Sequence, residues 1–159
     1  MDINITPIGI IETPFDELKG MPIQPSGADK IQGTIILDKE YEEGLSDLEG
    51  FSHIILLYHF HQSKGYNLMV KPFMDDKQRG LFSTRAPRRP NPIGLSIVQL
   101  CKIENNRISI QGIDVLNGTP LIDIKPYVPK FDEKEVTAIG WLEGKQEHVV
   151  SVKSDNRFF

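Results

Sequence analysis

The stretch LSIVQLCKIENNRISIQGIDV, residues 95–115, consists of two apolar runs on either side of three polar residues. Leu95–Ile103 and Arg107–Val115 are rich in Ile, Val and Leu, a composition that favours β-strands. The polar residues between them are Glu104, Asn105 and Asn106. Because asparagine tolerates the positive φ of a tight turn, the stretch predicts a β-hairpin.

Strand signals continue along the rest of the chain, whereas helix signals are few. Tyr41, Leu45 and Leu48 recur at helical spacing after Asp38, a candidate N-cap, so Lys39–Leu48 is expected to form one short helix. Many short strands with Pro and Gly between them favour a mainly β barrel or sandwich over a doubly wound α/β sheet. No repeat or linker is visible, so we expect one domain over residues 1–159. Four further segments predict strands: Ile3–Ile11, Gln32–Leu37, Ser52–His61 and Leu68–Val70.

The composition is that of a soluble globular protein. Apolar residues make up 39% and charged residues 25% of the chain. The single cysteine, Cys101, cannot form an internal disulfide, which favours a reducing compartment. The first residues lack the pattern of a signal peptide, and the longest apolar run, Ile54–Tyr58, is too short to span a bilayer. We therefore expect a cytoplasmic protein without membrane contact.

Positive charge is concentrated in one segment of a chain whose net charge is −4. Five basic residues and no acid lie between Lys77 and Arg89. The segment FSTRAPRRPNPIGLS, residues 82–96, places three arginines among prolines. Proline rigidity lowers the entropy cost of ordering a loop, and guanidinium groups bind carboxylate or phosphate bidentately. The segment therefore predicts a binding loop for an anion, with an exposed turn carrying incidental arginines as the alternative.

Several common site motifs are absent. The chain has no G-x-G-x-x-G, no P-loop and no G-x-S-x-G elbow. His53, His59 and His61 share strand parity, an arrangement that can bind a metal ion. No carboxylate or cysteine accompanies them in sequence, so we expect imidazoles that lie in the core or contact a ligand, and no metal.

A second unusual segment is DVLNGTPLIDIKPY, residues 114–127. Its Asn-Gly-Thr-Pro sequence predicts a tight turn, whose exposed backbone groups can closely approach an adenine or a ribose. Asp123 and Lys125 flank Ile124 and share one side if the segment is extended. They form an ordinary surface salt bridge, or a pair that serves proton transfer if they lie near residues 82–96, which we call the arginine segment.

Taken together, these segments resemble the TrmO family, also called TsaA-like or YaeB-like. The resemblance runs from about Ile8 to about Pro129. It implies a β-barrel in place of a Rossmann sheet, a homodimer with S-adenosylmethionine near the subunit interface, and methylation of N6 of N6-threonylcarbamoyladenosine at tRNA position 37. It is carried, in this order, by SH (52–53) with HQ (61–62), FSTR (82–85) with RPNPIG (89–94), and NGTP (117–120) with DIKPY (123–127).

The resemblance also implies roles for individual residues. Many relatives have arginine where this chain has Ile23, and aspartate where it has Asn117. The chain ends soon after the expected barrel, so we expect it to lack the C-terminal domain with which longer relatives hold tRNA. The implied cofactor contacts are Pro22, Ile23, Gln24, His61, Gln62, Arg85, Leu95, Asp114, Leu116, Asn117, Gly118 and Thr119.

Methyl transfer from a sulfonium to this nitrogen needs in-line positioning and removal of the N6 proton. Asp123 is the expected base or orienting acceptor, and Lys125 its partner. Arg88 and Arg89 are expected to hold the threonyl carboxylate or nearby phosphates, with Asn91 and Tyr127 as further substrate contacts. The alternatives are a methyltransferase acting on another small or RNA substrate, and an RNA-binding barrel without catalysis.

Overall fold

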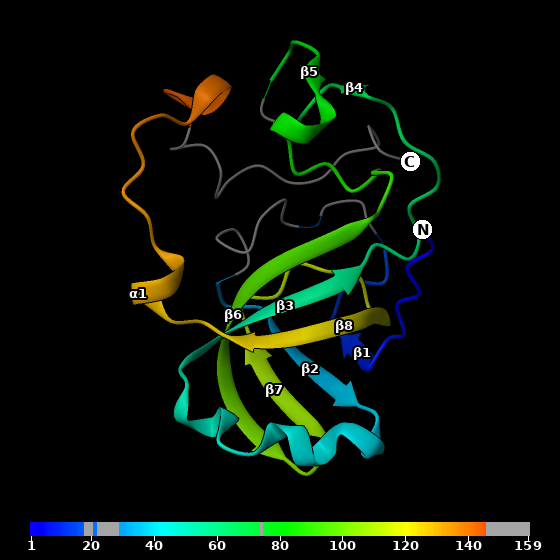
Figure 1. The fold of residues 1–159 in the computed structure, drawn as a ribbon, viewed down its shortest axis with the longest axis vertical. Coiled ribbons are helices and arrows are strands. Elements are labelled where there is room, and N and C mark those ends of the chain that lie inside the picture. Colours follow the sequence, from blue (N-terminus) through cyan, green and yellow to red (C-terminus); the bar gives the residue numbers. More distant parts are fainter. Residues whose placement is uncertain (18–20, 22–28, 74, 146–159) are drawn as a thin grey trace.

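Six antiparallel strands close into a barrel in the order β1-β2-β7-β6-β3-β8 (Figure 1). The computed structural model describes residues 1–17, 21, 29–73 and 75–145. The barrel confirms the mainly β prediction and decides between barrel and sandwich. Its strands are β1 (Gly9–Glu12), β2 (Gln32–Leu37), β3 (His53–His59), β6 (Ile93–Glu104), β7 (Arg107–Gln111) and β8 (Thr119–Pro126).

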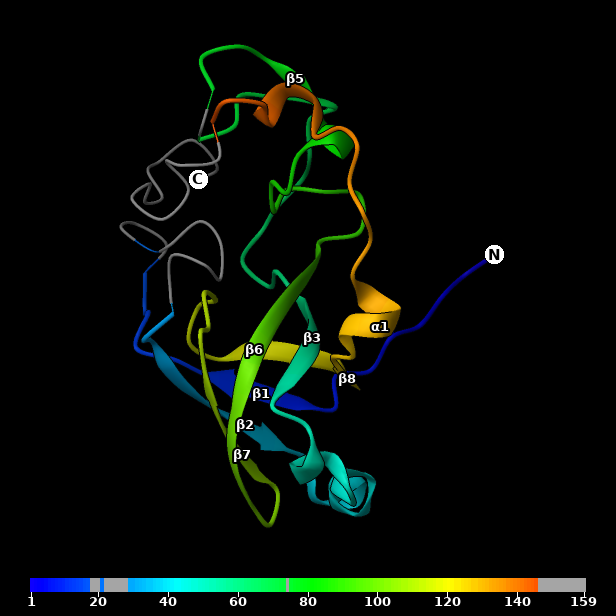
Figure 2. The same cartoon turned by 90° about the vertical axis from the view of Figure 1, so that its left-hand side faces the viewer.

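A small lobe lies beyond one end of the barrel, as Figures 1 and 2 both show. We call residues 60–73 and 75–92 the crossover lobe, because they connect β3 to β6. It contains the two-stranded sheet of β4 (Met69–Val70) and β5 (Arg79–Gly80), and the short 3-10 helix η4 (Leu81–Ser83). The remaining elements are η2 (Lys39–Leu45), η3 (Leu48–Gly50), α1 (Pro129–Asp132) and η5 (Gly140–Leu142). In the described ranges, no helix is long and apolar enough to cross a membrane.

The predicted hairpin is confirmed, with β6 paired to β7 and Asn105 at φ 53° in its turn. The second strand is shorter than predicted and ends at Gln111, because Gly112 turns the chain at φ 90°. The register shifts between Leu100 and Lys102, a β-bulge that leaves Cys101 exposed to solvent. The bulge bends β6, whose first half pairs with β3 and whose second half pairs with β7.

Two other predictions were wrong in detail. The segment Lys39–Leu48 forms 3-10 turns instead of an α-helix, and the side chain of Asp38 makes no capping hydrogen bond. The predicted strand Ile3–Ile11 forms only from Gly9, where pairing with β2 and β8 begins. The start of this strand is set by its pairing partners, which local sequence does not specify.

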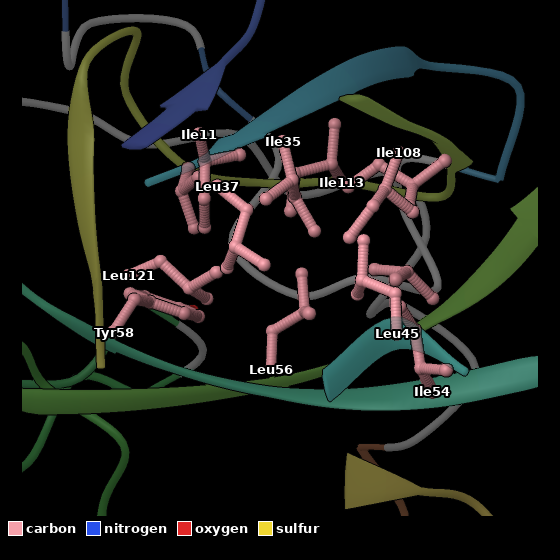
Figure 3. Packing of buried hydrophobic residues seen from close by; sticks show 13 residues of the cluster. Ile11, Ile35, Leu37, Leu45, Ile54, Leu56, Tyr58, Ile108, Ile113 and Leu121 are labelled. Carbon is pink, nitrogen blue, oxygen red and sulfur yellow. The ribbon is translucent and has the colours of Figure 1, made fainter. Parts of the chain in front are cut away.

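The barrel interior is filled by alternate residues of every strand (Figure 3). On β3, Ile54, Leu56 and Tyr58 point inward, and the residues between them point outward. Gly94 is required where the Tyr58 ring packs, because a Cβ there would lie 2.2 Å from a ring carbon. Leu45, from η2, covers the end of this core that lies away from the crossover lobe.

Strand directions bring three connecting segments to one end of the barrel. The antiparallel pairing places the ends of β1, β3 and β7 on the same side as the starts of β2, β6 and β8. The described residues that connect these strands, 13–17, 29–31, 60–73, 75–92 and 112–118, therefore lie at or beyond this end, which we call the upper end. The arginine segment and the Asn-Gly turn both lie at this end, although they are about 30 residues apart in the sequence.

Candidate functional site

A chain of three polar side chains runs from the core to the upper end of the barrel. Ser96 is fully buried, and its Oγ donates to Asp114 Oδ1 at 2.7 Å. The Tyr58 hydroxyl lies 2.9 Å from the same Oγ. Because Ser96 gives its proton to Asp114, Tyr58 is the donor in the second bond. The three residues therefore form one directed network that ends on the Asp114 carboxylate.

Burial sets the electrostatics of this network. It raises the pKa of Asp114 to about 6, although the Ser96 hydrogen bond and the charge of Arg85 both lower it. Burial, and then the negative charge of Asp114, raise the pKa of Tyr58, which stays protonated at all physiological pH values. Asp114 is thus a carboxylate held in a poorly solvated place with a guanidinium nearby, and a cationic ligand would stabilise its charged form.

The Asn-Gly turn, predicted to contact the cofactor, is held against the segment that follows β1. Asn117 accepts from the Thr13 amide at 3.2 Å and donates to Asp16 at 3.1 Å. An aspartate at position 117 could accept the first bond but could not donate the second, so the asparagine suits its neighbour Asp16. Gly118 adopts φ 74°, and the Thr119 hydroxyl is used within the turn, donating to the Leu116 carbonyl at 2.7 Å.

The arginine segment is held in shape by one of its own arginines. Arg89 Nη1 donates to the carbonyls of Thr84 (3.0 Å) and Ala86 (3.2 Å), and its guanidinium lies over the Phe82 ring at 5.8 Å. Arg88 contributes a buried Nε that has no hydrogen-bond acceptor among the described residues. Arg89 therefore shapes the loop, while Arg88 carries a buried donor that no described residue satisfies.

His61, Gln62 and Asn91 lie close together at the mouth of the upper end. The Phe60 amide donates to the Pro92 carbonyl at 2.8 Å, which brings the turn after β3 beside the residues that precede β6. His61 and Gln62 are exposed in this turn. Partial burial, and then the neighbouring charge of His59, lower the pKa of His61. Its imidazole is therefore neutral at pH 7 and able to donate or accept a hydrogen bond.

The predicted catalytic pair lies elsewhere, on the outer face of the barrel. Asp123 and Lys125 form an ion pair of 2.5 Å on β8, and both are partly exposed. Asp123 is opposite Leu57, which pairs in turn with the half-exposed Leu95 of β6. The structure thus brings Leu95 and Asp123 to one outer face, separate from the Asp114 network inside the barrel.

Tyr127 directly follows β8 and lies two residues after Lys125. Its amide donates to the carbonyl of His53, at the start of β3 and away from the upper end, and its hydroxyl donates to Glu133 at 3.2 Å. The predicted contacts Pro22, Ile23 and Gln24 lie outside the described residues.

The cleft found among the described residues lies away from the network. An open cleft of about 630 Å³ lies beside β1 and β2 and is lined by residues that include Glu12, Lys30 and Cys101. None of the network residues lines it. The described ranges hold no group of three or more His, Cys, Asp or Glu able to bind a metal ion. His53 and His59 share the outer face of β3, and His61 lies beyond the end of this strand.

Residues 10–133 match the family model of the tRNA-methyltransferase O N-terminal domain. The chain belongs to the TrmO family. A protein of Pyrococcus abyssi named as a probable S-adenosyl-L-methionine-binding protein is 52% identical over 96% of this chain and 83% of that protein. A tRNA (adenine(37)-N6)-methyltransferase of Homo sapiens is 37% identical over 81% of this chain. This chain matches 31% of the human protein.

Solved TrmO structures have the same fold. A TrmO crystal structure is 42% identical, with a TM-score of 0.76 over 88% of this chain and 64% of that one. TrmO from Pseudomonas aeruginosa is 39% identical, with a TM-score of 0.75 over 89% of this chain and 63% of that one. The chain therefore spans about two thirds of the length of these TrmO structures.

Tyr58 and Ser96 are the members of the network that sequence reasoning missed. The sequence could have indicated Ser96, because it lies two residues from both Gly94 and Val98. On a strand, this spacing predicts that its side chain faces the apolar core, as theirs do. A buried hydroxyl requires partners. In this TrmO-family chain the partners come from β3 and from the segment after β7, which no local pattern connects to β6.

Proposed function

We propose that this chain transfers the methyl group of S-adenosylmethionine to N6 of N6-threonylcarbamoyladenosine at tRNA position 37, as a cytoplasmic homodimer without a metal ion. The TrmO-family match over residues 10–133 carries the proposal. Relatives named for S-adenosyl-L-methionine binding and for tRNA adenine-37 methylation support it.

The residues at the upper end fit this cofactor. The amino-acid end of S-adenosylmethionine carries an ammonium, a carboxylate and a nearby sulfonium. Asp114 and Arg85 supply one negative and one positive group close enough to influence each other. The exposed Asn117-Gly118 turn offers backbone groups to a planar or hydroxylated ligand. When bound, S-adenosylmethionine supplies an electrophilic methyl group, and we assign its binding to Arg85, Asp114 and this turn.

Arg88 is the proposed receptor for the threonyl carboxylate. Its Nε is buried without an acceptor in the described part of the chain, and such a donor costs free energy until an anion satisfies it. Adenosine without the threonylcarbamoyl group leaves the donor unpaired, so the loop discriminates between modified and unmodified tRNA. Arg89 contributes by holding the loop in the shape that presents Arg88.

Asp123 remains the proposed base, and a second copy of the chain would bring it into the site. The outer face around it is apolar: Ile93 and Ile97 are partly exposed, and Leu95 is half exposed. Apolar side chains at three successive outward positions of one strand suit a protein interface better than solvent. A homodimer that covers this face would remove water from the Asp123–Lys125 pair.

Nucleoside analysis tests the reaction. The purified protein is incubated with S-adenosylmethionine and tRNA from cells that lack this methylation, and nucleosides are separated by mass spectrometry. The proposal expects a gain of one methyl group on N6-threonylcarbamoyladenosine only. A methylated product of another nucleoside would favour the alternative methyltransferase. No product, together with no calorimetric binding of S-adenosylmethionine, would favour an RNA-binding barrel without catalysis.

A further inference from the structure

An exposed aromatic ring stands beside the arginine segment. Phe82, in η4, is 73% exposed, while its neighbour Leu81 is buried in the small core of the crossover lobe. A single exposed apolar residue needs no explanation by itself. Phe82 differs because a cation lies over one face of its ring. The Arg89 guanidinium is 5.8 Å from the ring centroid and donates hydrogen bonds to two carbonyls of the same loop.

The backbone that carries Phe82 is fixed on both sides. The Ser83 hydroxyl donates to the Gly80 carbonyl at 2.8 Å, and the Ser83 carbonyl accepts from Trp141 Nε1 at 2.8 Å. Figures 1 and 2 show η5, which carries Trp141, beside this lobe. A ring held in this way loses little conformational entropy when a ligand binds to it.

Charge around the ring identifies the class of ligand. Between Lys77 and Arg89 there is no carboxylate. Two acids precede this segment: Asp76 lies 3.8 Å from Lys71 Nζ, and Asp75 is paired with Arg79 at 2.6 Å and Lys145 at 2.9 Å. These ion pairs hold the pKa of Asp75 well below its ordinary value, so it does not take up a proton at neutral pH. An exposed ring among cations suits a ligand that is both planar and anionic. Unpaired nucleotides have this chemistry, since the base stacks on aromatic rings and the phosphate contacts arginine.

We propose that the Phe82 ring stacks on an unpaired base of the RNA hairpin loop that contains the target adenosine. The inference rests on the proposed function, because it assigns a contact to the RNA substrate of the same site. It also accounts for the position of the ring, which lies three residues from Arg85 and six from Arg88 on one loop. Stacking tolerates any base, so Phe82 would position the loop while Arg88 selects the modified adenosine.

The experiment uses the full chain and an anticodon stem-loop RNA with 2-aminopurine next to the target position. Phe82→Ala is expected to weaken RNA binding by about 5- to 150-fold, the range for loss of one base–aromatic stack. It should also abolish the quenching of 2-aminopurine fluorescence, while S-adenosylmethionine binding stays unchanged. Phe82→Tyr should retain both RNA binding and quenching, because the ring remains. Phe82→Leu keeps apolar bulk without a π-face and should lose the quenching.

Phe131 provides a matched control. It is 72% exposed, on α1 and away from the crossover lobe, so Phe131→Ala should bind RNA as the parent protein does. RNA binding and quenching within twofold of the parent for Phe82→Ala would overturn the stacking assignment, as would equal losses for Phe82→Ala and Phe131→Ala. Quenching by a parent protein that transfers no methyl group would overturn the proposed function and leave the stacking intact.

Discussion

Replacing Asp114 with asparagine should make the protein more stable and less able to bind S-adenosylmethionine. The amide oxygen can still accept the Ser96 hydrogen bond, so the substitution removes the charge and keeps the shape. Burial raises the pKa of Asp114 from its ordinary value of 3.8 to about 6. At a pH above 6, the charged carboxylate therefore costs the folded state up to about 3 kcal/mol, which Asp114→Asn removes.

The pH dependence gives this prediction a definite sign. Between pH 3.8 and about 6 the folded state binds more protons at Asp114 than the unfolded state does. The stability contributed by the protonated carboxyl is complete below pH 3.8 and is lost as the pH rises through about 6. The unfolding free energies of parent and variant should therefore agree near pH 3.5 and diverge toward pH 7.

Urea denaturation at a series of pH values measures the stability difference, and calorimetry measures cofactor affinity. Because the ammonium and sulfonium favour the charged carboxylate, cofactor affinity of the parent should rise between pH 5 and pH 7, and that of Asp114→Asn should not. A variant less stable than the parent at pH 7 would refute the reasoning about burial. Equal affinity for S-adenosylmethionine at pH 7 would refute the role of Asp114 in cofactor binding.

Three further substitutions separate the roles of the remaining residues. Arg85→Ala should weaken S-adenosylmethionine binding, and unchanged calorimetric affinity would remove Arg85 from the cofactor site. Arg89→Lys should reduce substrate use more than cofactor binding, because an ammonium cannot hold two carbonyls and the Phe82 ring together; identical kinetics would contradict this. Asp123→Asn should fold, bind cofactor and lose methyl transfer by about a hundred- to ten-thousand-fold. Activity within about threefold of the parent would leave Asp123 as half of a surface ion pair with Lys125.

Local patterns predicted the strands and one turn well. The hairpin around Asn105 follows from apolar runs and a residue that accepts positive φ, and both operate over a few residues. Local sequence could not decide between a barrel and a sandwich, because closure depends on pairing between β1 and β8, about 110 residues apart. The TrmO resemblance supplied that choice.

The candidate site was only partly predictable, because its residues come from segments that are far apart in the sequence. The arginine segment and the Asn-Gly turn were recognisable from composition, and the structure brings both to the upper end of the barrel. The Tyr58–Ser96–Asp114 network was not recognisable, since its members lie 38 and 18 residues apart and meet only through β3, β6 and the segment after β7. Arg89 was predicted to contact substrate, but in the structure it donates hydrogen bonds to the carbonyls of Thr84 and Ala86. These bonds depend on a loop geometry that the prolines favour but do not specify.

Transfer of labelled methyl to two tRNA transcripts tests the proposed substrate most directly. One transcript carries N6-threonylcarbamoyladenosine at position 37, and the other carries plain adenosine there. The buried Nε of Arg88 has no acceptor in the described part of the chain, and under our proposal the threonyl carboxylate would supply one, so we expect incorporation into the first transcript only. Comparable incorporation into both transcripts would contradict the substrate assignment.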